Sequence, residues 1–277
     1  MRFSDIRDIR VLSMDYTLDK YRALCHTIDA SSYRCLTVEQ CVTMKEVQLD
    51  QNYIILRHDV DRFPVQAQAL ALIEHENNIK GSYYFRIPAS WHPDIIQYVS
   101  GLGHEVGLHY ECLDKAGGDL DKAGEILDKE LTSFRSLASV KTISMHGNPA
   151  TKFDNRALWS YFNLSQFDLV GEVYLSMDFE KVLYYSDTGR TWEDGKFNIK
   201  DIIPADMKSV GDKPTITTTD DLIQLIQNET RNLYILVHPE RWRGSVGGWL
   251  FSAASDHIIN YLKIIIKYAY RLRHKLT

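Results

Sequence analysis

The stretch Tyr53 to Phe63, "YIILRHDVDRF", changes abruptly from apolar to ionisable residues. Its first part, Tyr53 to Leu56, is apolar and partly β-branched, which predicts a buried β-strand. The ionisable residues that follow directly are Arg57, His58, Asp59, Asp61 and Arg62. Such residues at the end of a buried strand favour an α/β protein, because parallel strands present functional groups at their carboxyl ends.

Strands and helices alternate after this stretch. Val65 to Glu76 is rich in Ala and Leu and predicts a helix, and Ser82 to Ile87, "SYYFRI", predicts the next strand. A strand, a helix and a second strand in this order indicate a parallel sheet. Further helices are predicted at Asp94–Val99 and Leu120–Leu137, and further strands at Glu105–His109, Lys141–Met145 and Leu233–Val237.

The composition is that of an ordinary globular protein. The 277 residues are 44% hydrophobic and 25% charged, and neither a linker nor a repeat is visible, so we expect a single domain over residues 1–277. The formal net charge of -5 argues against a nucleic-acid partner. The pattern at the N-terminus and the cysteines predict a cytoplasmic protein: Met1 to Asp8 alternates charges, and no C-x-x-C pair occurs.

Ionisable residues recur where strands are predicted to end. Because the carboxyl ends of parallel strands lie at one edge of a sheet, these side chains are expected to converge. They are Asp59, Asp61, Arg86, His109, Glu111, His146 and His238.

This set is suited to metal-assisted hydrolysis. Asp59 and Asp61 are two residues apart and would face the same side of a strand, where a divalent metal relieves their repulsion. Imidazoles at His109 and His146 suit zinc, and three protein ligands leave one position open for water. A carboxylate that does not bind the metal can deprotonate that water, and another histidine can protonate the leaving group.

Three motifs follow one another along the chain: "RHDVD" at Arg57–Asp61, "GHEVGLHYE" at Gly103–Glu111 and "ILVHPERW" at Ile235–Trp242. They resemble those of the polysaccharide deacetylases with a NodB homology domain, carbohydrate esterase family 4. Between them, "SMHGNP" at Ser144–Pro149 and "SDTGRTW" at Ser186–Trp192 resemble features of a subgroup found in surface-polysaccharide gene clusters. The resemblance covers roughly positions 50 to 245 and implies a distorted, incomplete (β/α) barrel.

The resemblance also implies roles for individual residues. Asp59 corresponds to the general base and Asp61 to the first metal ligand. His109 corresponds to the next ligand, and His238 to the histidine that acts as general acid. His104 matches a position that is not a ligand and is either structural or supports the ligands from behind.

The sequence departs from the family at two points. The second ligand histidine normally lies four residues after the first, where this chain has Leu113. We expect His146 to take its place, with Glu111 as the alternative ligand. The Arg-Pro-Pro-Tyr-like motif that steadies the base is also absent, and the cations that could replace it, or bind substrate, are Arg57, Arg86 and Arg190.

Other residues keep two interpretations. Trp192, Trp242 and Trp249 could stack on a sugar ring or pack in the core. Asp187 and Arg190, three residues apart, could simply form an ion pair.

The two ends of the chain are expected to pack on the barrel. In the N-terminal extension, residues 1–50, Ser31–Leu36 predicts a strand and Thr37 caps a helix with Gln40 in a capping box. Residues 255–277 predict an amphipathic helix with a basic face. The simpler interpretation is a last barrel helix, and the alternative is contact with the inner face of an anionic membrane.

Three functions follow. The first is a metal-dependent hydrolase that removes an N- or O-acyl group, typically acetyl, from a sugar in surface-polysaccharide or glycolipid biosynthesis. The second is a catalytically silent relative that binds a glycan or a glycosyltransferase. The third is a hydrolase of a non-sugar C–N bond. The sequence leaves the sugar and the oligomeric state open.

Overall fold

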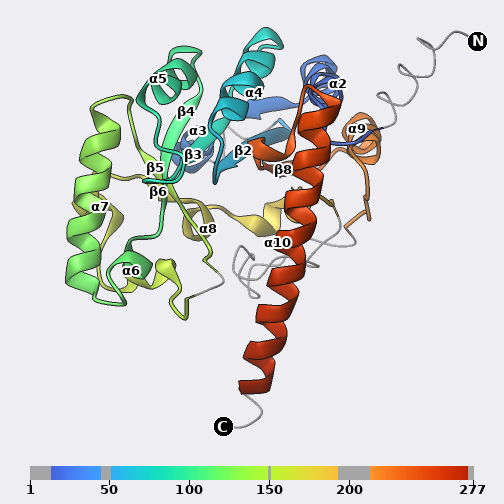
Figure 1. Cartoon of the computed structure of the whole chain (residues 1–277). Coiled ribbons are helices and arrows are strands. Elements are labelled where there is room, and N and C mark those ends of the chain that lie inside the picture. The colour runs from blue at the N-terminus through green and yellow to red at the C-terminus, as the bar shows by residue number, and fades with distance from the viewer. Residues whose placement is uncertain (1–13, 45–50, 149–150, 193–212, 274–277) are drawn as a thin grey trace, which may run out of the picture.

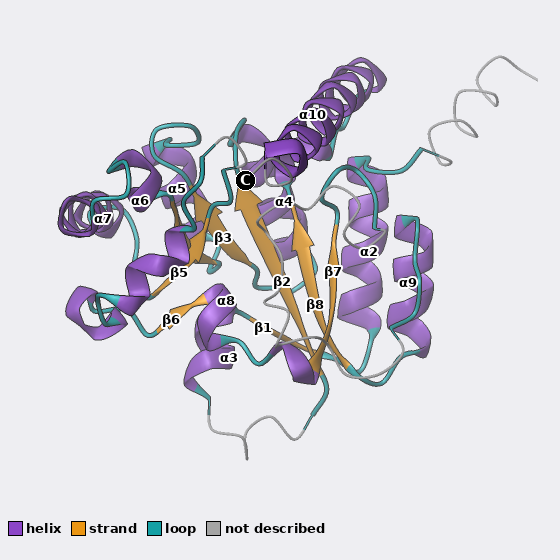
Figure 2. Cartoon of the chain, turned by 90° about the horizontal axis from the view of Figure 1, so that it is seen from below, coloured by secondary structure: helices purple, strands orange, loops and turns teal. Residues whose placement is uncertain are grey.

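The computed structural model describes residues 14–44, 51–148, 151–192 and 213–273, and the side chains of the last helix up to residue 262. Its centre is a parallel sheet that curls into a half-barrel with helices around it (Figures 1 and 2). The strands follow the order β6-β5-β4-β3-β2-β8-β7, and β1 pairs with the first half of β2. The predicted α/β fold with a parallel sheet is therefore confirmed.

The strands are short, apart from the central β2. Their bounds are β1 Arg34–Leu36, β2 Tyr53–Val60, β3 Ser82–Phe85, β4 Glu105–Tyr110, β5 Thr142–Met145, β6 Gly171–Glu172, β7 Val182–Ser186 and β8 Asn232–Val237. The predicted strands are confirmed within a few residues, with one correction. Because β2 continues to Val60, Arg57, His58 and Asp59 lie inside the strand and not beyond its end.

The helices flank the sheet. They are α2 Leu18–Ala30, α3 Val38–Thr43, α4 Val65–Glu76, α5 Pro93–Gly101, α6 Cys112–Lys115, α7 Leu120–Arg135, α8 Val173–Ser176, α9 Thr219–Asn228 and α10 Val246–Arg273. The predicted helix at Val65–Glu76 is confirmed with the same bounds. The short 3-10 helices are η2 Asn155–Ser160, η3 Leu164–Phe167, η4 Phe179–Lys181 and η5 Pro239–Arg241.

Side chains of β2 alternate between two apolar clusters. Ile54 and Leu56 pack in a cluster with residues of α2 and α4, whereas Tyr53 and Ile55 belong to a cluster that includes Tyr174 of α8. Since successive side chains of a strand point to opposite faces, Arg57 and Asp59 share the face of Ile55, and His58 lies on the other. The burial of β2 on both faces fixes this register.

The N-terminal segment contributes to the sheet as well as covering it. β1 pairs with β2. The predicted capping box at the start of α3 is confirmed, because the backbone N–H of Gln40 donates to Thr37 Oγ1 at 3.2 Å and the backbone N–H of Thr37 donates to Gln40 Oε1 at 3.0 Å. Residues 1–13 and 45–50 of the predicted extension lie outside the described residues.

The C-terminal helix starts earlier than predicted. α10 begins at Val246 and extends away from the body of the molecule (Figure 1). Within the described part of the chain, no helix is both long and apolar enough to cross a membrane.

Candidate metal centre

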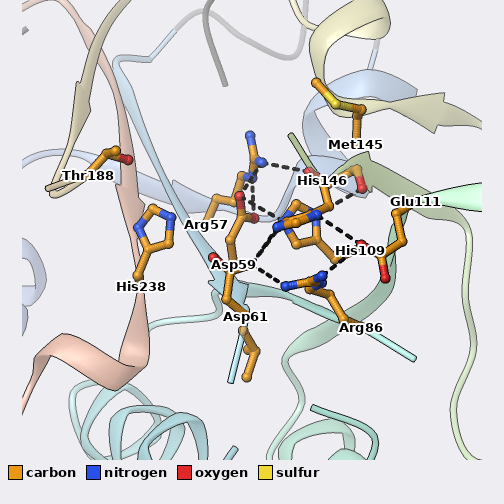
Figure 3. Close-up of polar contacts among 12 residues, drawn as sticks. Arg57, Asp59, Asp61, Arg86, His109, Glu111, Met145, His146, Thr188 and His238 are labelled. Carbon is orange, nitrogen blue, oxygen red and sulfur yellow. Dashed lines mark hydrogen bonds and ion pairs between the residues drawn. The ribbon is translucent and has the colours of Figure 1, made fainter. Parts of the chain in front are cut away.

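Three predicted ligands converge at the carboxyl ends of their strands (Figure 3). Asp61 directly follows β2, His109 lies in β4, and His146 follows β5. Asp61 Oδ1 lies 3.5 Å from His109 Nε2 and 3.7 Å from His146 Nε2. The two imidazole rings stand edge to face, with centroids 5.2 Å apart. One carboxylate oxygen is thus shared by two imidazoles.

The contacts behind the two rings leave their Nε2 atoms facing Asp61. The Nδ1–H of His109 donates to the carbonyl oxygen of Ser144 at 2.9 Å. His146 Nδ1 lies 3.1 Å from Glu111 Oε2, within hydrogen-bonding distance but not aligned as a hydrogen bond. Carboxylates and carbonyls in these positions are the usual partners of metal-bound histidines, because they fix the ring and leave the other nitrogen free to bind.

Two negatively charged carboxylates lie near Nε2 of His109, and a cation at this place would reduce their repulsion. A neutral imidazole with a hydrogen on Nδ1 would direct its Nε2 lone pair at two carboxylates, since Asp59 Oδ2 lies 3.6 Å away and Asp61 Oδ1 3.5 Å away. Burial lowers the pKa of His109, but the two carboxylates raise it above its usual value. For Asp61, burial raises the pKa, and the contact with His109 together with the charge of His146 lowers it well below its usual range. A proton or a metal ion relieves this repulsion.

The donor atoms suit a divalent metal in kind, and the two separations from Asp61 Oδ1 are close to those between ligands of a metal ion. Asp61 Oδ1 is buried and has no hydrogen-bond partner among the described residues. Two ligands about 2.0–2.2 Å from a tetrahedral zinc ion stand roughly 3.4 Å apart, close to the separations found here. In the described residues no group of three His, Cys, Asp or Glu side chains is already arranged to hold a metal ion.

Asp59 lies beside this group, and both of its carboxylate oxygens accept hydrogen bonds from Arg57. The guanidinium donates to both carboxylate oxygens, Nε to Oδ1 at 2.8 Å and one terminal nitrogen to Oδ2 at 2.5 Å. The same nitrogen donates to Ser144 Oγ at 2.6 Å. Both side chains are almost fully buried. Burial raises the pKa of Asp59, but Arg57 together with the charges of His109 and His238 lowers it below its usual value.

The other two candidate arginines have different partners. Arg86 donates to Glu111 Oε2 at 2.7 Å and lies 3.9 Å from Asp61 Oδ1. Arg190 lies 3.3 Å from Asp256 Oδ2 on α10. Of the three arginines proposed to steady Asp59, only Arg57 contacts it.

His238, at the end of β8, stands on the opposite side of Asp59 and Asp61 from His109 and His146 (Figure 3). Its Nδ1 lies 2.6 Å from Asp187 Oδ1, and its peptide N–H donates to the same carboxylate at 3.1 Å. Because Nδ1–H donates to Asp187, Nε2 is the nitrogen left for proton transfer, and it has no hydrogen bond to any of the described residues. The charge of His238 contributes to lowering the pKa of both Asp59 and Asp61.

Comparison with known proteins does not identify a family for this chain. It matches no protein-family model and no curated protein.

Asp187 is the site residue that the sequence analysis missed. It follows β7 and accepts hydrogen bonds from Arg241 at 2.6 Å and from the Trp242 indole at 3.1 Å, besides those from His238. Burial raises its pKa, but Arg241 and His238 lower it, so the carboxylate stays ionised. An ion pair between Asp187 and Arg190 does not form, because Arg190 points to Asp256 instead. The sequence does contain a signal for Asp187, because this acidic residue comes shortly after an apolar run, as Asp59 and Asp61 come after Tyr53–Leu56.

Two tryptophans cannot stack on a sugar. Trp242 and Trp192 are fully buried among the aromatic residues of one apolar cluster, so the interpretation of Trp242 as a sugar platform is wrong. Trp249, at the start of α10, is half-buried and donates its indole N–H to the Asp15 carbonyl at 2.6 Å. Leu113 is buried in the core near η2, so position 113 offers no polar group to the site.

His104 has a structural environment, as expected. Its Nδ1 accepts from the Gly81 N–H at 3.0 Å, and Nε2–H donates to the Ala71 carbonyl at 2.9 Å. It lies in a buried polar group behind the sheet with Glu74 and His58, whose Nε2 is 2.8 Å from Glu74 Oε1. This group is separate from the candidate metal centre.

Proposed function

We propose that this protein is a metal-dependent hydrolase of the NodB type that removes an N- or O-acyl group, such as acetyl, from a sugar. The observation that carries the proposal is that two neighbouring carboxylates, Asp59 and Asp61, have different partners. Asp61 faces two imidazoles, whereas Asp59 is fixed by Arg57 beside them. A metal hydrolase needs this pairing of a ligand carboxylate with a separate, ionised base.

In this proposal Asp61, His109 and His146 hold the metal, and Glu111 orients His146. One oxygen and two nitrogen donors suit zinc. The bound metal would polarise the acyl carbonyl and lower the pKa of water. Glu111 is less suited as a ligand, since its Oε2 is already engaged by Arg86 at 2.7 Å.

The chain's own residues supply the proton transfers. Asp59 takes a proton from the water whose oxygen bonds to the acyl carbon, and Arg57 keeps Asp59 ionised until then. The C–N or C–O bond to the sugar breaks, and His238 gives a proton from Nε2 to the departing nitrogen or oxygen. Asp187 stabilises the charged imidazole and holds the ring in place. The products are a carboxylic acid, such as acetate, and the free amino or hydroxyl sugar.

The substrate class rests on the motifs. "SMHGNP" and "SDTGRTW" resemble those of the surface-polysaccharide subgroup, which favours a sugar or glycolipid intermediate in the cytoplasm. Hydrolysis of a non-sugar C–N bond by the same residues is the alternative enzyme. A silent glycan-binding relative is the alternative without catalysis, favoured by Leu113, which stands at the position of the family's second ligand histidine.

The test is a hydrolysis assay on a panel of N-acetyl and O-acetyl sugars, their nucleotide-linked forms and non-sugar amides. The zinc-loaded protein should release acetate from a sugar, and chelation should stop this until zinc is restored. Release only from non-sugar amides would move the proposal to the alternative enzyme. No release from any compound by protein with stoichiometric zinc would favour the silent relative.

A further inference from the structure

The helix α10 attaches to the body through its polar side. Ser252 Oγ donates to the Glu240 carbonyl at 3.0 Å, and Asn260 Nδ2 donates to the Gly189 carbonyl at 2.8 Å. Between them, Asp256 accepts from Arg62 at 3.2 Å and from Arg190 at 3.3 Å. These three α10 residues are four apart and buried, so they form one face of the helix.

The opposite face of α10 is apolar and exposed. At 100° per residue its members fall on one side of the helix, away from Ser252, Asp256 and Asn260. Their exposed fractions range from 51% at Leu262 to 67% at Tyr261. A surface helix normally buries its apolar stripe and exposes its polar one, and α10 does the reverse. The exposed apolar residues are Leu250, Phe251, Ile258, Tyr261 and Leu262.

Charge decides between the possible occupants of this face. After Asp256 the sequence contains no acidic residue, and it adds Lys263, Lys267, Arg271, Arg273 and Lys275. A parallel pair of α10 helices would bring together two copies of this segment, each with basic residues and no acidic residue after Asp256, without the acidic partners that coiled coils place beside the seam. An anionic lipid surface offers complementary charge, and basic residues close to an apolar helix face are typical of helices that bind such surfaces.

We propose that the outward face of α10 binds an anionic phospholipid membrane, with the helix lying in the plane of the surface. At 1.5 Å per residue, the 28 residues of α10 extend about 42 Å. The apolar residues enter the boundary between headgroups and acyl chains, and the tyrosine at 261 places its hydroxyl among the headgroups. The polar contacts to Arg62, Arg190 and Gly189 keep the helix fixed to the body while it binds. This proposal does not depend on the hydrolase activity.

The test is sedimentation of the full chain with vesicles of phosphatidylcholine alone or mixed with phosphatidylglycerol. We expect binding to the mixed vesicles only, weakened by high salt. The double variant Phe251→Glu with Ile258→Glu should bind at least about tenfold more weakly, since both apolar side chains leave the lipid. A matched control, Leu72→Glu with Val170→Glu, changes two exposed apolar residues outside α10 and should bind like wild type.

Thermal unfolding of each variant separates loss of binding from loss of fold. Equal sedimentation of wild type and the α10 variant, or no binding of wild type to either vesicle, would overturn the proposal. A dimer of the wild type that the α10 substitutions dissociate, without vesicle binding, would assign this face to a second copy of the chain instead.

Discussion

Glu111 Oε2 lies 3.1 Å from His146 Nδ1, on the ring nitrogen opposite the one that faces Asp61. This contact supports different roles for His146 and Glu111, the two candidates for the third metal ligand. His146 presents a nitrogen to the proposed metal, and Glu111 stands behind it. The distinction matters because Leu113 leaves the position of the usual second histidine without a donor.

Glu111→Gln should therefore weaken zinc binding without abolishing it. Loss of a carboxylate that orients a metal-bound histidine typically lowers metal affinity by about 10–100-fold. Competition with a zinc chelator measures the change, and His146→Ala should lose zinc altogether. If His146→Ala keeps zinc and Glu111→Gln loses it, the roles are reversed.

Asp59→Asn should separate catalysis from metal binding. The amide cannot accept the proton from water, so kcat should fall by at least about 100-fold. Zinc content should stay at the wild-type value, because both oxygens of Asp59 accept from Arg57, whereas Asp61 Oδ1 lies near both imidazoles. Unchanged turnover would remove Asp59 from the role of general base.

Asp187→Asn should impair His238 without removing it. Asp187 orients the imidazole and stabilises its charged form, so we expect a lower kcat and an altered pH–rate profile. Trp242→Phe is the matched control, because it removes one hydrogen bond to Asp187 and keeps an aromatic ring in the core. An Asp187→Asn protein that is as stable as wild type and has an unchanged pH–rate profile would contradict this role.

The buried carboxylate Glu74 should make stability depend on pH. Burial raises its pKa, but His58 and His104 lower it, so the folded-state pKa lies below the unfolded value of about 4.3. A depressed pKa contributes stability above the unfolded value, and this is lost as pH falls through the folded pKa. Urea unfolding should show Glu74→Gln destabilised at pH 7, by about 1–3 kcal/mol for the altered buried hydrogen bonds, and less so near pH 3.

Glu76→Gln on the same helix provides the control for Glu74→Gln. Glu76 is exposed, so its substitution should change the free energy of unfolding little at any pH. A pH-independent difference between wild type and Glu74→Gln would show that Glu74 does not titrate as proposed.

Local patterns in the sequence predicted most of the sheet. The apolar runs before Arg57 and His238 indicate β2 and β8. The Ala- and Leu-rich composition of Val65–Glu76 indicates the helix, and Gly81 indicates that it ends before that residue. These features act over a few residues, so they can be read without the fold. The start of α10 was missed because Gly247 and Gly248 have low helix propensity, which packing against the body overrides.

The partners within the site could not be predicted in the same way. Arg57, Arg86 and Arg190 are chemically equivalent in the sequence, and only the alternation along β2 places Arg57 beside Asp59. Trp242 precedes an exposed loop, yet tertiary packing buries it against Tyr21 with ring centroids 4.9 Å apart. Asp187 lies 51 residues from His238, and the parallel pairing of β7 with β8 brings them together. Such long-range pairings depend on topology.

The most direct test of the metal centre is elemental analysis of the purified protein after mild chelation and refilling with zinc, beside Asp61→Ala and His146→Ala. Asp94→Ala on the exposed start of α5 serves as the control. The proposed site predicts close to one zinc per chain in wild type and control, and none in the other two variants. Zinc retained by Asp61→Ala, or no zinc in refilled wild type, would contradict it.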